Sequence, residues 1–301
     1  MANTESVRRE VHVLNLGAGV QSTTLFLMSR EGLVHPFDAA IFADTQEEPQ
    51  QVYRHIEWLK SLGSPRIITT TKGKLGDHLK KGTSSTGQRF ASIPAFTAPD
   101  HRLRPNLNGC EHGRIQRQCT KEYKIEPIGQ AIRRILLGLA PRRRVPASIH
   151  IHQYYGISYD ERKRATKIKQ RNEGLKQTTL HFPLIEKNFT RDDCKDWLST
   201  RVPHEVPRSA CTFCPFKTYT EWLKLKTTSP ADWQRAIDID KALRVDGNIV
   251  NRSMDLKLYL VRKCIPLDMV DLEAEAKAEQ AKKPPPDMFA LLDCGLGMCG
   301  V

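Results

Sequence analysis

A stretch of small and polar residues near the start of the chain has the composition of an anion-binding loop. It follows an apolar run and contains Gly17, Ala18, Gly19, Gln21 and Ser22. Glycines let the backbone approach a ligand closely, and the N–H groups at the start of a following helix can hold an anion. The stretch lacks the Gly-Lys-Ser/Thr of a Walker A motif and the third glycine of the dinucleotide fingerprint. We therefore expect an unspecified anion here, with a plain glycine turn as the alternative.

Cysteines are the second group of residues with chemical potential. The chain has eight, at Cys110, Cys119, Cys194, Cys211, Cys214, Cys264, Cys294 and Cys299. Cys211 and Cys214 form a Cys-x-x-Cys pair, a spacing typical of a metal site, a cluster or redox chemistry. We expect Cys194 and Cys264 to be buried as small apolar side chains. A disulfide framework is not expected, because we interpret the chain as cytoplasmic.

Alternating strands and helices are expected to position the loop. The pattern predicts strands at 11–16, 37–45 and 66–71, with helices at 22–32 and 49–63 between them. This order predicts a parallel α/β sheet that binds ligands at the carboxyl ends of its strands. A long loop is expected over 82–118, followed by a helix over 119–139 that breaks at or near Pro127.

The second half of the chain contains further strands and amphipathic helices. We expect extended segments at 149–158 and 178–186, and helices at 190–200, 218–226 and 229–243, the first capped by Thr190. Residues 271–286 are Ala-rich, charged and end in three prolines, which indicates a helix and a linker. We predict three parts: a nucleotide-binding domain at 1–225, a helical extension and linker at 226–286, and a cysteine-containing tail at 287–301.

The charge balance favours an anionic substrate or partner. Lys and Arg total 47 against 34 Asp and Glu, a net charge of +13. This suits a nucleic acid or another polyanion, and a solvated basic surface is the alternative. No apolar run approaches the length of a membrane helix, so no membrane association is expected.

Six segments, in order, resemble those of the phosphoadenosine phosphosulfate (PAPS) reductase-like family of the adenine nucleotide α-hydrolase (PP-loop) superfamily. They are GAGVQS (17–22), FADTQEEP (42–49), RQCTKEYKIEPI (117–128), GISYDER (156–162), FPLIEKNFTRDDCKDWL (182–198) and SACTFCP (209–215). The resemblance covers about two-thirds of the chain. It implies a Rossmann-like sheet with helices on both faces, which binds an adenine nucleotide, either ATP or PAPS.

The resemblance also assigns roles to individual residues. Loop N–H groups and the Ser22 hydroxyl would hold phosphate or sulfate oxygens, and Asp44 and Thr45 would lie beside the nucleotide. Glu161 matches the family's glutamate, and Arg164 lies where an arginine can meet phosphate. Gln21 replaces the usual loop aspartate, so a magnesium ion would depend on Asp44 or on a substrate phosphate.

The same resemblance implies a metal centre and a reactive tail. Cys119, Cys211 and Cys214 match three of the four thiolates that hold a 4Fe–4S cluster in related reductases, and Gln118 replaces the fourth. Cys110 is our candidate for the missing ligand, with Cys294 and Cys299 as alternatives, and zinc is the alternative metal. The tail segment DCGLG resembles one that carries a nucleophilic cysteine, which makes Cys294 a candidate catalytic residue. Asp44 and Glu161, from the FADTQEEP and GISYDER segments, are the other two candidates.

Three functions are compatible with these features. The first is a nucleotide-dependent sulfur-transfer or modification enzyme acting on DNA or tRNA, with a cysteine desulfurase as a candidate sulfur donor. The second is a PAPS or adenosine phosphosulfate reductase that uses a thioredoxin-like reductant and releases sulfite. The third is a non-catalytic module that binds a nucleotide or a nucleic acid.

Overall fold

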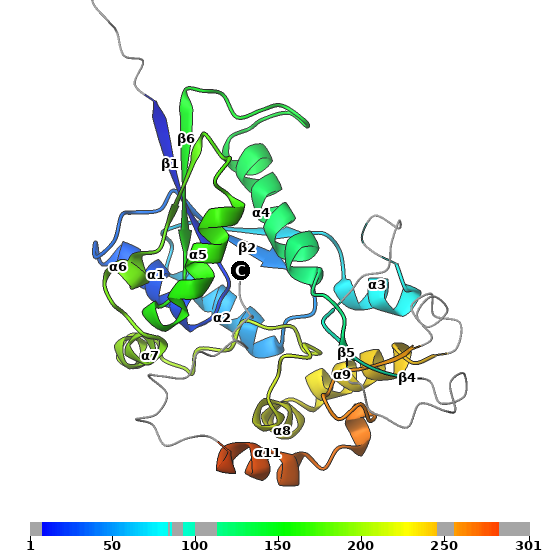
Figure 1. Ribbon diagram of the computed structural model, residues 1–301. Helices are drawn as coiled ribbons and strands as arrows, with labels where there is room; N and C mark the ends of the chain where they lie inside the picture. Colours follow the sequence, from blue (N-terminus) through cyan, green and yellow to red (C-terminus); the bar gives the residue numbers. More distant parts are fainter. Residues whose placement is uncertain (1–7, 84, 86–92, 100–112, 246–255, 283–301) are drawn as a thin grey trace, which may run out of the picture.

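The computed structural model describes residues 8–83, 85, 93–99, 113–245 and 256–282. Its centre is a parallel sheet of five strands in the order β3-β2-β1-β6-β7 (Figure 1). The strands are β1 (Arg9–Leu16), β2 (Ala39–Asp44), β3 (Ile67–Thr71), β6 (Ile149–Tyr155) and β7 (Thr178–His181). The predicted parallel α/β sheet is confirmed, with β1 at its centre.

Alternating side chains of the strands build a core on each face of the sheet. Leu14 and Phe42 pack on one face with α1 (Val20–Arg30), α2 (Gln50–Ser61) and α7 (Arg191–Ser199). Val13 and Ile41 pack on the other face with α4 (Glu126–Ala131). On that second face, Tyr155 packs with α5 (Arg162–Arg171), next to the short η3 (Tyr159–Glu161). Helices therefore cover both faces, as predicted.

The helix that follows residue 118 does not break at Pro127, contrary to our prediction. Helical backbone is continuous through η1 (Lys121–Ile125), α4 and η2 (Ile132–Leu136), and both η segments have π-helical bonding. The N–H of Glu126 donates to the carbonyl oxygen of Lys121 in this wider turn. Pro127, which has no N–H, follows directly, so the π-turn accommodates the missing donor without a break.

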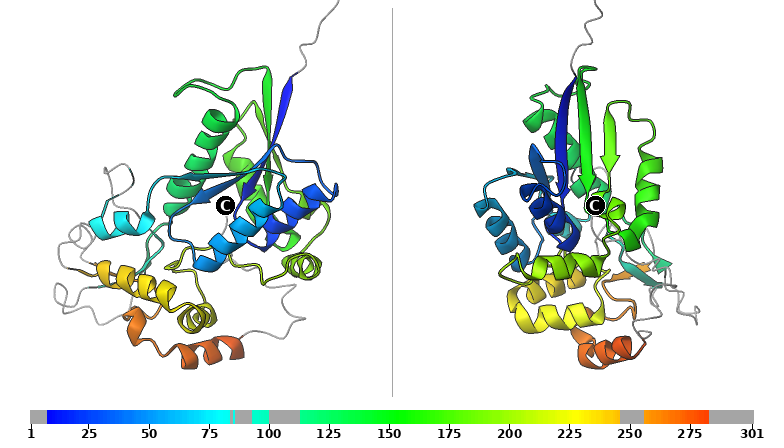
Figure 2. Two further views of the ribbon diagram at one scale, coloured as in Figure 1. Left: turned by 180° about the vertical axis from the view of Figure 1, so that it is seen from behind. Right: turned by 90° about the vertical axis from the view of Figure 1, so that its left-hand side faces the viewer.

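A second layer of helices lies below the carboxyl ends of the strands (Figures 1 and 2). It consists of α8 (Tyr219–Thr228), α9 (Pro230–Ala242) and α11 (Leu272–Ala281), with α3 (Leu75–Lys81) and η4 (Leu267–Met269) beside α9. A capping box at Thr218 starts α8, and Pro230 occupies the first turn of α9. The helices expected at 218–226, 229–243 and within 271–286 are thus confirmed.

A small antiparallel sheet joins this layer, and it corrects the prediction of one long loop over 82–118. Its strands are β4 (Phe96–Pro99), β5 (Gly113–Arg114) and β8 (Leu256–Tyr259), in the order β5-β4-β8. The strands are only two to four residues long, and partners as distant as Phe96 and Tyr259 pair with each other. Such pairing leaves no local periodicity for sequence analysis to detect.

One hydrophobic core spans the segments on either side of the predicted boundary at residue 225. Leu75, Tyr123 and Phe213 pack in the same cluster as Trp222 and Ile237. Residues 178–186 also differ in part from the expected extended segment, since β7 is followed by the one-turn helix α6 (Pro183–Glu186). None of the helices in the described ranges is long and apolar enough to cross a membrane.

Candidate functional site

The predicted anion-binding loop lies between the carboxyl end of β1 and the first turn of α1. Ala18 adopts a left-handed backbone with φ of 58°, and Gly19 is the N-cap of the helix. The Ser22 hydroxyl accepts a hydrogen bond from the Gly19 N–H (3.3 Å) and donates to the Gly19 carbonyl (3.2 Å). In this arrangement Ser22 holds the shape of the loop, and the N–H groups of the first helical turn supply the positive end of the helix dipole.

The side chain of Ser209 packs against the two glycines of this loop. A Cβ placed on Gly17 would lie 3.3 Å from the Ser209 hydroxyl oxygen, and one on Gly19 would lie 3.2 Å from the Ser209 Cβ. The Ser209 Oγ is buried and has no hydrogen-bond partner among the described residues. A buried hydroxyl without a partner is costly, so an oxygen-rich ligand in the loop would complete its bonding. Sequence analysis missed Ser209, although it is the first residue of the SACTFCP segment (209–215) that was singled out.

Three of the predicted site residues meet beside the first turn of α1. The Gln21 side-chain amide donates to Glu161 Oε2 at 2.9 Å and to the Ser158 hydroxyl at 3.4 Å. Arg164 donates to the other Glu161 oxygen at 3.2 Å. Glu161 therefore orients both an amide and a guanidinium group, and the guanidinium can compensate negative charge on a ligand. The short η3 helix and the start of α5, which follow β6 in the sequence, place Glu161 and Arg164 beside the loop.

Asp44 and Thr45 lie at the carboxyl end of β2, which neighbours β1 in the sheet. Asp44 accepts hydrogen bonds from the Gln46 N–H (2.7 Å) and the Tyr53 hydroxyl (3.0 Å), both at Oδ1. Burial and the Asp44 charge raise the pKa of Tyr53 above its ordinary value. Thr45 is buried and donates to Glu48 Oε1 at 3.3 Å, so its hydroxyl is used inside the protein.

A small recess lies between the ends of β1 and β2. Asn15, Gly17, Phe42 and Lys124 line it, and its volume of about 10 Å³ suits a single water molecule. The Lys124 ammonium lies 3.5 Å from Glu48 Oε1, which is a buried ion pair. Sequence analysis did not assign Lys124 a role, although it lies within the RQCTKEYK segment that was singled out. A much larger cavity, of about 590 Å³, is lined in part by segment 204–208.

The described residues do not assemble the predicted metal centre. Cys119 and Cys211 are partly buried against the hydrophobic core that contains Tyr123 and Phe213. The Cys214 N–H donates to the Cys211 carbonyl at 3.2 Å. Across the described ranges, no group of three or more His, Cys, Asp or Glu side chains is arranged to hold a metal ion. Cys110, Cys294 and Cys299 lie outside those ranges. No chemical step is therefore assigned to an iron–sulfur cluster or zinc.

Two cysteines were predicted to be buried for structural reasons. Cys194 on α7 is fully buried, and desolvation raises the pKa of its thiol to about 11. The prediction for Cys194 is confirmed. Cys264 is only half-buried, because it lies in a surface turn with a left-handed φ of 51°. Burial was therefore the wrong expectation for Cys264.

Comparison with known proteins does not identify a family for this chain. No protein-family model matches the chain, and neither does any curated protein. The resemblance to the PAPS reductase-like family therefore stays a prediction, and the arrangement around the loop carries the functional argument.

Proposed function

We propose that this protein is an enzyme that binds an adenine nucleotide, ATP or PAPS, with a phosphate or sulfate group in the loop at residues 17–22. The single observation that carries the proposal is the Ser209 hydroxyl, which is buried over Gly17 and Gly19 without a partner among the described residues. The same loop contains a left-handed residue, Ala18, and leads into the N-terminus of α1, whose first N–H groups are further hydrogen-bond donors. Such a set of donors suits an oxyanion.

The neighbouring charged cluster suits chemistry at phosphorus or sulfur. In the ATP case, an acceptor atom attacks the α-phosphorus, the bond to the β-phosphate breaks, and pyrophosphate leaves. Arg164 compensates the charge that develops on the phosphoryl oxygens, and Glu161 keeps both Arg164 and Gln21 in position. The net charge of +13 favours a nucleic acid as the acceptor in this reaction.

The adenine preference and the cysteine chemistry rest on the sequence resemblance. A cluster or zinc ion held by Cys110, Cys119, Cys211 and Cys214 would supply sulfur chemistry, and Cys294 is the candidate nucleophile of a reductase. Of these cysteines, Cys110 and Cys294 lie outside the described ranges. The cysteine chemistry is separated from nucleotide binding in the experiment below.

The test measures ATP and PAPS binding by calorimetry for the wild type and for Ser209→Ala. Loss of a hydrogen bond to a charged oxygen should weaken binding by about 10- to 100-fold, which corresponds to about 1.5–3 kcal/mol. Because Ser209 Oγ has no partner in the described structure, the variant should keep its full thermal stability. Thr212→Val is the matched control, since Thr212 Oγ1 is also buried without a described partner.

Product analysis then separates the enzyme classes. Pyrophosphate or AMP release that requires nucleic acid supports the modification enzyme, whereas sulfite release from PAPS with thioredoxin assigns a reductase instead. Binding without either product supports the non-catalytic module. If the wild type binds neither ATP nor PAPS, or if Ser209→Ala binds them as tightly as wild type, the proposed site is wrong.

A further inference from the structure

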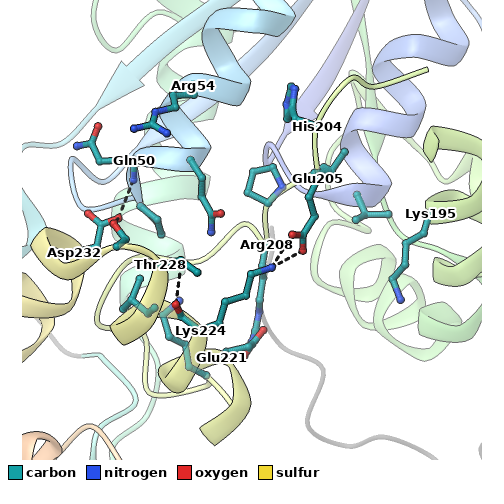
Figure 3. Close-up of a pocket in the computed structure, with 18 of the residues that line it drawn as sticks. Gln50, Arg54, Lys195, His204, Glu205, Arg208, Glu221, Lys224, Thr228 and Asp232 are labelled. Atoms are coloured by element: carbon teal, nitrogen blue, oxygen red, sulfur yellow. Dashed lines mark hydrogen bonds and ion pairs between the residues drawn. The ribbon is translucent and has the colours of Figure 1, made fainter. Parts of the chain in front are cut away.

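A large cavity lies next to the nucleotide loop and takes no part in the site described above. Its volume is about 590 Å³, within the range of about 300–1,000 Å³ that is usual for ligand sites. Residues of α2, α7, α8 and α9 line it, together with the segment 204–208 (Figure 3). The cavity therefore lies between the helices that pack on the central sheet and the second layer of helices.

Cationic side chains outnumber carboxylates in the lining of this cavity. The six cations are Arg54, Arg191, Lys195, Arg208, Lys217 and Lys224, and the three carboxylates are Glu205, Glu221 and Asp232. Figure 3 shows Arg54 and Lys195 on opposite sides of the cavity. Lys195 pairs with Asp192 at 2.6 Å, so the two walls contribute positive charge chiefly through Arg54 on α2 and Arg191 on α7.

The three carboxylates are already engaged with protein groups. Both Glu205 oxygens accept from Lys224 (2.6 and 2.7 Å), and Glu221 pairs with Arg208. Asp232 accepts from the Gln50 N–H at 3.1 Å and the Ser229 hydroxyl at 2.7 Å, and it pairs with Arg235.

Two of the arginines, in contrast, are left for a ligand. In the part of the chain that the structure describes, the guanidinium groups of Arg54 and Arg191 form no ion pair with a carboxylate. Arg54 is exposed on α2, and Arg191 is the first residue of α7. They are therefore available to compensate charge on an anionic ligand.

The cavity and the nucleotide loop share a wall. The Pro207 carbonyl would lie 3.8 Å from a Cβ on Gly19, and Ser209, two residues later, covers the loop. Pro207 and Val20, the first residue of α1, also line the cavity. A ligand in the cavity would therefore lie directly beside a nucleotide bound at the loop.

We propose that this cavity binds the sugar–phosphate backbone of a single-stranded nucleic acid and presents it to the bound nucleotide. The inference rests on the proposed function, because it places the acceptor of that reaction. Among the described residues that line the cavity, none is Phe, Tyr or Trp. The ring of His204, which also lines the cavity, already contacts His55 and Trp58. The strand is therefore held mainly through its phosphates, which gives sequence-tolerant and salt-sensitive binding. A cavity of about 590 Å³ is too small to enclose a duplex, so we expect single strands to bind more tightly than duplexes.

The experiment measures fluorescence anisotropy of labelled DNA and RNA oligonucleotides, single-stranded and duplex, over a series of salt concentrations. The test variant carries Arg54→Glu and Arg191→Glu. We expect single-strand binding at least tenfold weaker than wild type, with the slope of log K against log salt shallower by about 1.4, or about 0.7 for each lost phosphate contact. Circular dichroism melting checks that the variant is folded.

The matched control carries Arg142→Glu and Arg144→Glu, which change the net charge by the same amount. These exposed residues precede the amino end of β6, whereas the loop lies at the carboxyl ends of the strands. We expect the control to bind single strands almost as the wild type does. An equal loss in both variants, tighter binding of duplex than of single strand, or no oligonucleotide binding by the wild type would each overturn the proposal.

This inference and the proposed function can fail separately. A wild type that binds oligonucleotides through Arg54 and Arg191, but binds neither ATP nor PAPS, refutes the nucleotide site and leaves the cavity assignment standing. A wild type that binds ATP and does not bind oligonucleotides refutes the cavity assignment alone.

Discussion

Gly156, directly after β6, lies against the backbone of Ser22 in the first turn of α1. A Cβ on Gly156 would lie 2.6 Å from the Ser22 nitrogen and 2.8 Å from its Cα. Real side chains do not approach a backbone so closely, so only glycine allows this contact. The contact fixes the start of α1 against the end of β6, and thereby fixes the donors that the loop presents.

We predict that Gly156→Ala weakens nucleotide binding and destabilises the protein by about 1–3 kcal/mol, the usual cost of overpacking. The cause is a shift of the α1 N-terminus away from β6. Chemical denaturation and calorimetric titration measure the two effects. Gly129→Ala is the control, because a Cβ there meets nothing within 4 Å inside α4, and it should be neutral or stabilising. Unchanged binding in Gly156→Ala would contradict the prediction.

A buried histidine makes stability depend on pH. His55 is fully buried and bridges the Thr23 hydroxyl (2.9 Å) and His204 Nε2 (2.8 Å). Burial and the neighbouring His204 lower the pKa of His55 from 6.5 to about 4. The unfolded chain gains a proton near pH 6.5, but the folded chain does so only near pH 4. The contribution of His55 to the free energy of unfolding is therefore fully present above pH 6.5 and is lost as the pH falls to about 4.

We predict that His55 alone contributes a loss of up to about 3 kcal/mol in the free energy of unfolding between pH 6.5 and pH 4. Urea denaturation at a series of pH values measures it. His55→Gln can keep the hydrogen bonds but cannot titrate, so its stability should fall less steeply than that of the wild type. His12, whose pKa burial and His35 lower to about 4, leaves a residual slope in both proteins. Parallel profiles would refute the assignment to His55.

Asp240 on α9 attaches the small sheet to the second helical layer. Its buried carboxylate accepts from the N–H groups of Leu260 (3.2 Å) and Leu267 (2.9 Å) and pairs with Arg244 at 2.5 Å. We predict that Asp240→Ala costs about 3 kcal/mol, because it leaves a buried cation and two N–H groups without their acceptor. Asp238→Ala, on the exposed side of the same helix, should cost less than about 0.5 kcal/mol in the same denaturation assay.

Burial should also protect Cys194 from alkylation. Its pKa of about 11 and complete burial leave almost no accessible thiolate at pH 8. We predict that iodoacetamide leaves Cys194 unmodified in the native protein and modifies it in denaturant, while the half-buried Cys264 reacts earlier. Peptide mass spectrometry gives the extent of modification at each site. Rapid native labelling of Cys194 would show that α7 does not pack as described.

Local signals explain which parts of the fold could be predicted. Gly32 and Gly63, with φ of 72° and 87°, follow the ends of α1 and α2, as their sequence positions indicate. Thr190 caps α7 through the Asp193 N–H, which is a signal contained within four residues. Elements of this kind are specified by neighbours in the sequence, so periodicity and caps suffice to find them.

The candidate site was predictable only in part, for a physical reason. Gln21, Glu161 and Arg164 were singled out separately, and the structure brings them together because β1 and β6 are neighbours in the sheet. The contact of Ser209 with Gly19 and the cavity beyond it depend on packing between segments that lie 190 residues apart in the sequence. No local pattern records such packing.

The three short strands of the small sheet have a consequence for synthesis of the chain. β4 pairs with β5 nearby in the sequence, but it also pairs with β8 at residues 256–259. During translation the central sheet and its helices can form early, while β4 has no outer partner until β8 has left the ribosome. The hydrophobic core in which Tyr123 and Phe213 pack with Leu258 is therefore completed last. Any fragment that stops before β8 would expose that core to chaperones and proteases.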